Sequence, residues 1–154
     1  MSNFVEIKIM NFSEFFKELI LEKSITIQKI SKVTNIDDSS LYDYLHGTLP
    51  DVKSAVKLAN YFNCSLNYLM GIDDGPNEVK FYQTYDLTLF SDRYDKLLKE
   101  NKIAHFRLHK ETGLNYSSHY AWQHGAIPNI SSLIIIAKYF NVSIDYLVGR
   151  CDSY

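Results

Sequence analysis

Residues 101–125 hold most of the side chains in this sequence that could do chemistry. Four of the five histidines lie there, together with two tyrosines, two serines, two lysines and one arginine. Hydroxyl, imidazole and guanidinium groups hydrogen-bond to the bases and phosphates of nucleic acids, and imidazoles also bind zinc. No nucleophile, base and orienting group occur at a spacing typical of catalysis, so we do not expect an enzyme.

Zinc has to be weighed because His105 and His109 are four residues apart, which would place both on one face of a helix, and His119 and His124 follow. Structural zinc sites usually include cysteine ligands, and no cysteine is close to these histidines. We therefore expect solvated or hydrogen-bonded histidines and no metal.

Two short helices separated by a turn must position these side chains. Residues 104–112 can form the first helix, and Gly113 supplies the left-handed residue that ends it. Asn115 is a suitable N-cap for the second helix, which ends at Gly125. Two short helices joined by such a glycine-containing turn form a helix-turn-helix. A long apolar helix follows, and then Asn-Val-Ser-Ile-Asp-Tyr-Leu-Val-Gly at 141–149.

The order and spacing of these helices and the closing Tyr-Leu-Val-Gly resemble the phage-repressor DNA-binding family, the Cro/repressor or XRE type. The resemblance implies a transcriptional regulator that binds double-stranded DNA and needs no metal or cofactor. It also implies that the third helix of the domain meets base edges in the major groove, while the start of the second helix meets phosphates. Carried onto this sequence, the DNA-contacting positions are His105, Arg107, Lys110, Asn115, Tyr116, Ser117, Ser118, Tyr120 and His124.

The chain also contains an internal repeat. Sliding the sequence against itself by 78 positions aligns residues 12–74 with residues 90–152 without a gap. The identical pairs include Leu19/Leu97, Ser39/Ser117, Ser40/Ser118, Tyr42/Tyr120, His46/His124, Gly47/Gly125, Pro50/Pro128, Tyr61/Tyr139, Tyr68/Tyr146 and Gly71/Gly149. The sequence thus predicts an all-α protein with two tandem, five-helix, lambda-repressor-like domains at 1–74 and 89–154, joined by a linker at 75–88.

The elements of each repeat follow from local patterns. Ser13 and Ser91 are candidate N-caps of the first helices. The fourth helices show apolar residues at i, i+3, i+4 and i+7, which predicts a stripe that faces the core. The stripes are Val52, Ala55, Val56, Ala59 and Phe62, and Ile130, Leu133, Ile134, Ala137 and Phe140. Alternating apolar residues at 1–10 and in the linker predict a minor β pairing.

The two repeats differ where DNA would bind. The third helix of the first repeat carries Asp37, Asp38 and Asp43, and carboxylates there would repel phosphate; neither third helix has a lysine or arginine. The residues of the first repeat that correspond to DNA-contacting positions are Ser39, Ser40, Tyr42, Asp43 and His46. His119 takes the place of core-facing Leu41, so we expect a partly buried histidine with one hydrogen-bond partner.

Charge supports this division. The net charge is −2; residues 1–78 hold seven lysines and eleven acidic residues, and residues 79–154 hold nine basic and seven acidic residues. The second domain is therefore the expected main DNA reader. The alternative is a helix-turn-helix fold that binds a protein partner through the acidic first domain, and a homodimer stays open as well.

The remaining expectations concern cellular location. The sequence contains no apolar run of the ~20 residues that a membrane helix needs, and residues 1–10 do not resemble a signal peptide. We expect a cytoplasmic protein in which Cys64 and Cys151 are free thiols.

Overall fold

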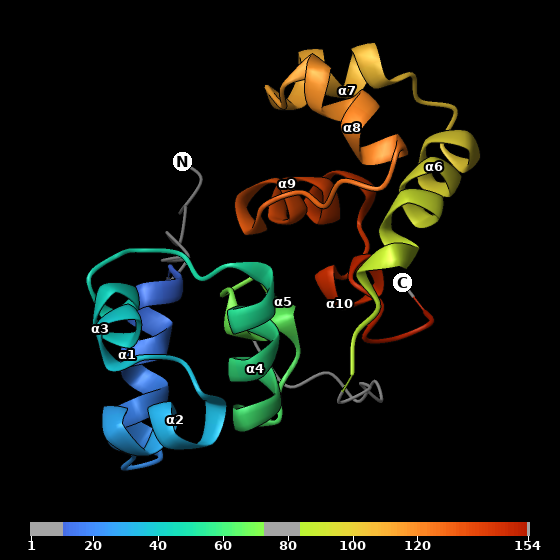
Figure 1. The fold of residues 1–154 in the computed structure, drawn as a ribbon. Helices are drawn as coiled ribbons and strands as arrows, with labels where there is room; N and C mark the ends of the chain where they lie inside the picture. Colours follow the sequence, from blue (N-terminus) through green and yellow to red (C-terminus); the bar gives the residue numbers. More distant parts are fainter. Residues whose placement is uncertain (1–10, 73–83, 154) are drawn as a thin grey trace, which may run out of the picture.

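The structure is a computed structural model that describes residues 11–72 and 84–153. Within these ranges the chain forms ten α-helices and one short 3₁₀ helix and contains no strand (Figure 1), which confirms the predicted all-α fold. None of the described helices is long and apolar enough to cross a membrane. The predicted β pairing and most of the predicted linker lie outside the described residues.

The helices fall into an N-terminal half, residues 11–72, and a C-terminal half, residues 84–153. The N-terminal half contains α1 (Phe12–Glu22), α2 (Ile27–Thr34), α3 (Asp38–Leu45), α4 (Val52–Phe62) and α5 (Leu66–Leu69). The C-terminal half contains η1 (Leu87–Leu89), α6 (Phe90–Glu100), α7 (His105–Thr112), α8 (Tyr116–Gln123), α9 (Ile130–Phe140) and α10 (Ile144–Leu147). Each helix from α1 to α5 has a counterpart with the same length and bounds at an offset of 78 residues.

Capping residues explain why the helices begin and end where they do. The side chains of Thr26, Asp51 and Ser65 accept a hydrogen bond from a backbone N–H in the first turn of α2, α4 and α5. Helix α7 ends at Gly113, whose φ of 77° lies in the left-handed region that glycine adopts without strain. At the same position of the N-terminal half, α2 ends at Asn35 with φ of 60°.

The prediction that Ser13 caps α1 and Ser91 caps α6 is wrong. Asn11 caps α1, and α6 continues directly from η1. The hydroxyl of Ser13 instead donates to the carbonyl of Leu45 at 2.7 Å, and that of Ser91 donates to the carbonyl of Gln123 at 2.9 Å. In each half this serine therefore ties the first helix to the end of the third.

The predicted core stripes are present on both fourth helices. All five residues of the α4 stripe are buried, as are Ile130, Leu133 and Ala137 on α9. Ile134 and Phe140 are half-buried and pack against the same core. The buried face is wider than predicted, because Leu58 and Ile136 are also fully buried.

The two halves meet at α5 and α10 (Figure 1). The backbone N–H of Ile144 donates to Oδ1 of Asn67 at 2.8 Å, and that of Leu66 donates to both carboxylate oxygens of Asp145 at 3.0 and 3.1 Å. Asn67 and Asp145 correspond at the 78-residue offset, as do Leu66 and Ile144. Each half therefore satisfies the first N–H of the other half's last helix, and we call this exchange the α5–α10 joint.

An ion pair completes the joint. Arg150 and Asp145 are buried, with Nη1 of the arginine 2.5 Å from Oδ1 of the carboxylate. The guanidinium also donates across the joint to the carbonyl of Cys64 at 3.3 Å and to Oδ1 of Asn60 at 2.8 Å. The residue of the N-terminal half that corresponds to Arg150 is Ile72. The two hydrogen-bond exchanges of the joint are therefore symmetric, but the arginine is present in only one half.

The joint predicts a graded loss of stability. Asp145→Ala would remove the acceptor of the Leu66 N–H and leave the buried Arg150 cation without its carboxylate. We expect it to lower the free energy of unfolding by about 3–5 kcal/mol. Asn67→Ala removes only the acceptor of the Ile144 N–H, which should lower the free energy of unfolding by about 1–3 kcal/mol. Urea denaturation of the full chain, followed by circular dichroism, measures both. The control is Asp43→Ala at an exposed position, where the free energy of unfolding should change by no more than about 0.5 kcal/mol. If Asp145→Ala changed the free energy of unfolding as little as this control does, the prediction would be wrong.

Candidate nucleic-acid interface

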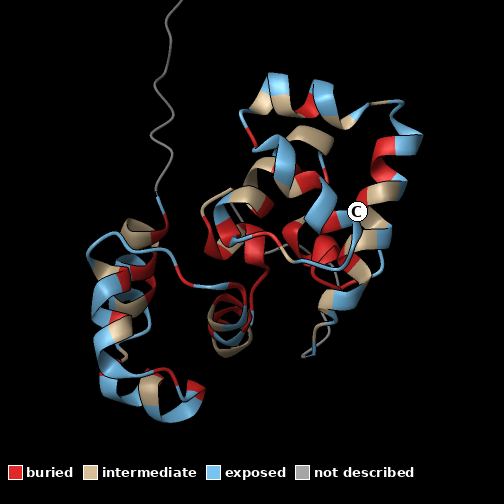
Figure 2. Cartoon of the chain, turned by 45° about the horizontal axis from the view of Figure 1, so that its top comes forward, coloured by how far each residue is buried: buried red, intermediate tan, exposed pale blue. Residues whose placement is uncertain are grey.

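The helix-turn-helix of the C-terminal half is formed by α7 and α8, which pack on one another. Many residues of these two helices are exposed, and exposed residues are drawn pale blue in Figure 2. Tyr116 and Tyr120 are 48% and 69% exposed, and His105 and Ser118 are half-buried or exposed. The other predicted contact residues on this face are also exposed: Arg107, Lys110, Asn115, Ser117 and His124. The fold thus brings the predicted residues of the second repeat onto one pair of helices.

Aromatic rings dominate this face. The ring of Tyr116 lies 4.7 Å from that of His105, 5.9 Å from that of His109 and 6.3 Å from that of Phe106, measured between centroids. Phe106 is 60% exposed and was not predicted to belong to the site. Its position between His105 and Arg107 is the only signal in the sequence that would have included it. The surface offers flat apolar rings beside hydroxyl groups, which suits contact with thymine methyl groups and base edges.

The end of α8 repeats a feature of the end of α3. Nδ1 of His124 lies 2.7 Å from the carbonyl oxygen of Tyr120, and Nδ1 of His46 lies 2.7 Å from that of Tyr42. Each histidine follows the last residue of its helix, where its imidazole N–H satisfies a carbonyl that has no partner within the helix. The ring of His124 also stacks on that of Tyr120 at 4.1 Å.

Three polar residues lie beneath this face. Oη of Tyr94 is 2.8 Å from Nδ1 of His119, and the rings of His119 and His105 stack with centroids 3.9 Å apart. Tyr94 and His119 are buried, so His119 has the expected hydrogen-bond partner but is more buried than the partial burial that the sequence predicted. The corresponding residues of the N-terminal half are all apolar: Phe16, Ile27 and Leu41. The C-terminal half therefore has a hydrogen-bonded polar trio where the N-terminal half has three packed apolar side chains.

Burial favours the neutral forms of Tyr94 and His119. Desolvation lowers the pKa of His119 below its ordinary 6.5, the neighbouring His105 lowers it further, and Asp95 opposes the shift. Burial raises the pKa of Tyr94, so its hydroxyl keeps its proton beside His119. Two stacked imidazoles do not present their nitrogen atoms to a common metal ion.

Arg107 is exposed and forms an ion pair with a residue of its own helix. Its Nε donates to Oε1 of Glu111 at 2.8 Å, and Glu111 also accepts the hydroxyl of Tyr139 from α9. The hydrogen bond from Arg107 and then that from Tyr139 lower the pKa of Glu111, so the carboxylate is ionised near neutral pH. A phosphate that binds Arg107 must compete with this carboxylate.

The corresponding face of the N-terminal half is acidic. Asp37 occupies the N-cap position of α3, but its carboxylate accepts a hydrogen bond from the hydroxyl of Ser39 at 2.7 Å instead of capping the helix. Hydrogen bonds from Ser40 and Ser39 lower the pKa of Asp37 and favour the charged form. Tyr42 is 44% exposed beside exposed Asp43.

Comparison with known proteins gives one family match, in the acidic half. Residues 16–69, from α1 to the end of α5, match a family model described as helix-turn-helix. No curated protein and no solved structure matches the chain. The match supports a DNA-binding regulator of the helix-turn-helix type, a group that is generally not enzymatic.

The buried trio predicts a dependence of stability on pH. Because the folded protein binds a proton at His119 less readily than the unfolded chain does, the stabilisation is complete above about pH 6.5 and is lost as the pH falls below it. Thermal midpoints between about pH 7.5 and 5.5 should fall less in His119→Leu than in the wild type. His46→Leu removes an exposed histidine and serves as the control; if it flattens the profile as much as His119→Leu, the buried trio is not the cause.

Proposed function

We propose that the protein is a transcriptional regulator of the phage-repressor type, in which two tandem helix-turn-helix domains bind double-stranded DNA and the C-terminal half makes most of the contacts. The observation that carries the proposal is the chemistry of the two third helices. Helix α8 presents aromatic and hydroxyl groups without a carboxylate, whereas α3 and its cap present Asp37, Asp38 and Asp43. Only the face of α8 can approach a phosphate-lined groove without repulsion.

Basic residues on the second helices support phosphate contact at both sites. Arg107 and Lys110 are exposed on α7, and Lys29 and Lys32 are exposed at the corresponding positions of α2. Phosphate contacts fix the position of a protein on DNA, while base contacts determine sequence. The acidic half can therefore help to hold the duplex through α2 even though α3 reads it poorly.

The α5–α10 joint supports the tandem arrangement. Repressors of this type usually bind two half-sites ~34 Å apart as homodimers. Here one chain holds two helix-turn-helix elements through a reciprocal joint, so a second chain is not needed to supply the second element. We expect the preferred DNA to contain two unequal half-sites.

A second candidate function is favoured by the exposed surface of α3. Tyr42 is 44% exposed on α3 next to exposed Asp43, and Asp37 and Asp38 are exposed at the start of the same helix. An aromatic and acidic surface of this kind suits a basic protein partner better than DNA. Under this alternative, Asp43→Lys and Tyr42→Ala should each abolish capture of a partner in a pull-down with the full chain.

Selection from random duplexes tests the primary proposal. The whole chain should enrich a defined sequence. Titration at two salt concentrations should show that it binds this sequence more tightly than the nonspecific Kd of ~10⁻⁴–10⁻⁶ M. Arg107→Ala should weaken all sequences about equally and reduce the salt slope by ~1. Lys29→Ala is the matched control in the N-terminal half, and its effect should be smaller.

Base-contacting residues should behave differently from Arg107. Tyr120→Ala and Ser118→Ala should change which sequence is preferred, and each should weaken binding to the selected duplex by ~1–3 kcal/mol, the usual value of a good interaction with a base. Tyr42→Ala, at the matched position of α3, should leave the preference unchanged. If selection enriches no sequence, or if Tyr42→Ala shifts the preference more than Tyr120→Ala does, the C-terminal half is not the main DNA reader.

A further inference from the structure

We propose that the groove between the start of α4 and the start of α9 binds a small, uncharged, largely apolar molecule, and that this molecule regulates DNA binding. The site lies between the two halves and is separate from the outward faces of α3 and α8. Its existence does not depend on the proposed function; its regulatory role does.

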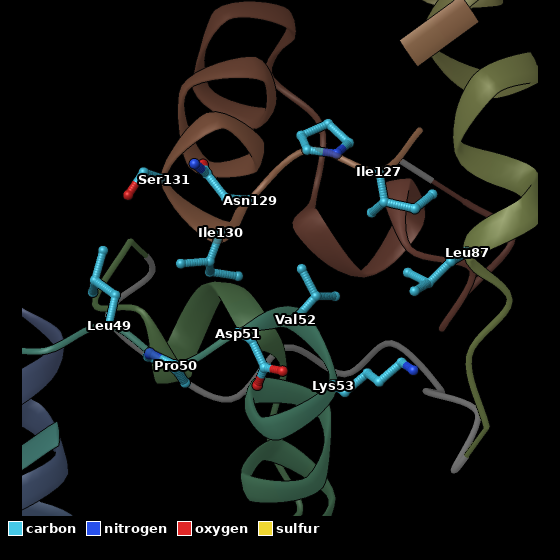
Figure 3. A pocket seen from close by; sticks show the side chains of 11 residues that line it. Leu49, Pro50, Asp51, Val52, Lys53, Leu87, Ile127, Asn129, Ile130 and Ser131 are labelled. Atoms are coloured by element: carbon cyan, nitrogen blue, oxygen red, sulfur yellow. The ribbon is translucent and has the colours of Figure 1, made fainter. Parts of the chain in front are cut away.

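The groove is formed by matching segments of the two halves. Its volume is about 630 Å³, within the ~300–1,000 Å³ typical of small-molecule sites. Ten of its lining residues form pairs at the 78-residue offset: Leu49/Ile127, Pro50/Pro128, Asp51/Asn129, Val52/Ile130 and Lys53/Ser131. The eleventh is Leu87 of η1. Figure 3 shows that the side chains of Val52, Ile130, Ile127 and Leu87 point toward the space between the halves.

The chemistry of the walls selects the ligand. Val52 and Ile130 are buried at 8% and 3% exposure, and Leu87 and Ile127 are half-buried, so the inner wall is apolar. The carboxylate of Asp51 already accepts the N–H of Ser54 at 3.0 Å, and the side chain of Asn129 accepts that of Ser132 at 2.9 Å. Oδ1 of each cap is therefore engaged with its own helix.

The rim carries no net charge. Asp51 and Lys53 are both exposed and contribute one negative and one positive charge, while Asn129 and Ser131 are neutral. Such a rim gives no net attraction for an anion or a cation. A bound molecule would instead gain free energy by removing from water the exposed parts of Leu49, Leu87 and Ile127. The groove therefore suits an uncharged molecule with a ring or an aliphatic body.

The position of the groove links occupancy to DNA binding. Its lining segments, 49–53 and 127–131, follow α3 and α8 closely in the chain, and in the proposed function α3 and α8 are the helices that face the major groove. A molecule that contacts both segments favours one relative placement of the two halves. A ligand shifts an equilibrium between placements by as much as its affinity for them differs.

The test uses N-phenyl-1-naphthylamine, an uncharged apolar dye whose fluorescence rises in apolar surroundings. The full chain should give a saturable rise in fluorescence. Ile127→Trp, which fills the groove, should weaken dye binding roughly tenfold or more. Leu49→Trp, at an exposed position of the groove, should also weaken dye binding. This second variant keeps the test valid if Ile127→Trp destabilises the fold. Leu21→Trp, at a 76% exposed position of α1 that does not line the groove, is the matched control.

Three results would overturn the proposal. No saturable rise with the wild type would exclude the site, and equal dye affinity in Leu49→Trp and Leu21→Trp would place the dye elsewhere. An unchanged affinity for the selected duplex at saturating dye would exclude the regulatory role. Dye binding is measured without DNA, so failure of the proposed function leaves this part of the test intact and is distinguished from failure of the site.

Discussion

The α5–α10 joint is the interaction on which the rest of the structure depends. Each of these helices is one turn long, and an isolated helix of that length is not stable in water because its nucleation cost is not recovered. The first N–H groups of a helix have no partner within it, and a buried one without an acceptor costs about 1–3 kcal/mol. Asn67 and Asp145 supply those acceptors reciprocally, so the last helix of each half is completed by the other half.

The ion pair within the joint contributes specificity more than stability. Removing two charges from water costs several kcal/mol per ion, and their attraction in a buried site repays this only with good geometry and further hydrogen bonds. Arg150 meets that condition, since it also donates to the carbonyl of Cys64 and to Asn60 of the other half. Arg150 and Asp145 belong to the same half, so a wrong pairing of the halves would not separate them. It would instead remove the hydrogen bonds that this ion pair makes with Leu66, Cys64 and Asn60 of the other half, and that loss disfavours the alternatives.

Local signals in the sequence were sufficient for the helices but not for their assembly. Glycine and asparagine at helix ends, N-capping side chains and the apolar stripe of α4 and α9 are short-range features, and they predicted the helix bounds closely. Asn67 and Asp145 lie on one-turn helices with no periodic pattern, and their partners are 77 and 79 residues away. Ser13 has the residue type of an N-cap, but its acceptor is on α3. The hydrogen bond from Tyr139 to Glu111 was missed for the same reason, because Tyr139 reaches Glu111 from a different helix.

The joint also changes what a single mutation can do. In a regulator assembled from two identical chains, every substitution appears twice and must be acceptable at both positions. In a chain that carries both halves, a substitution can occur in one half while the matching residue of the other half stays unchanged. The exchange of Phe16, Ile27 and Leu41 for Tyr94, His105 and His119 illustrates the freedom, since a proton-sensitive cluster has been admitted to one half while the other keeps an apolar core. Two similar halves within one chain can therefore carry different side chains at matching positions.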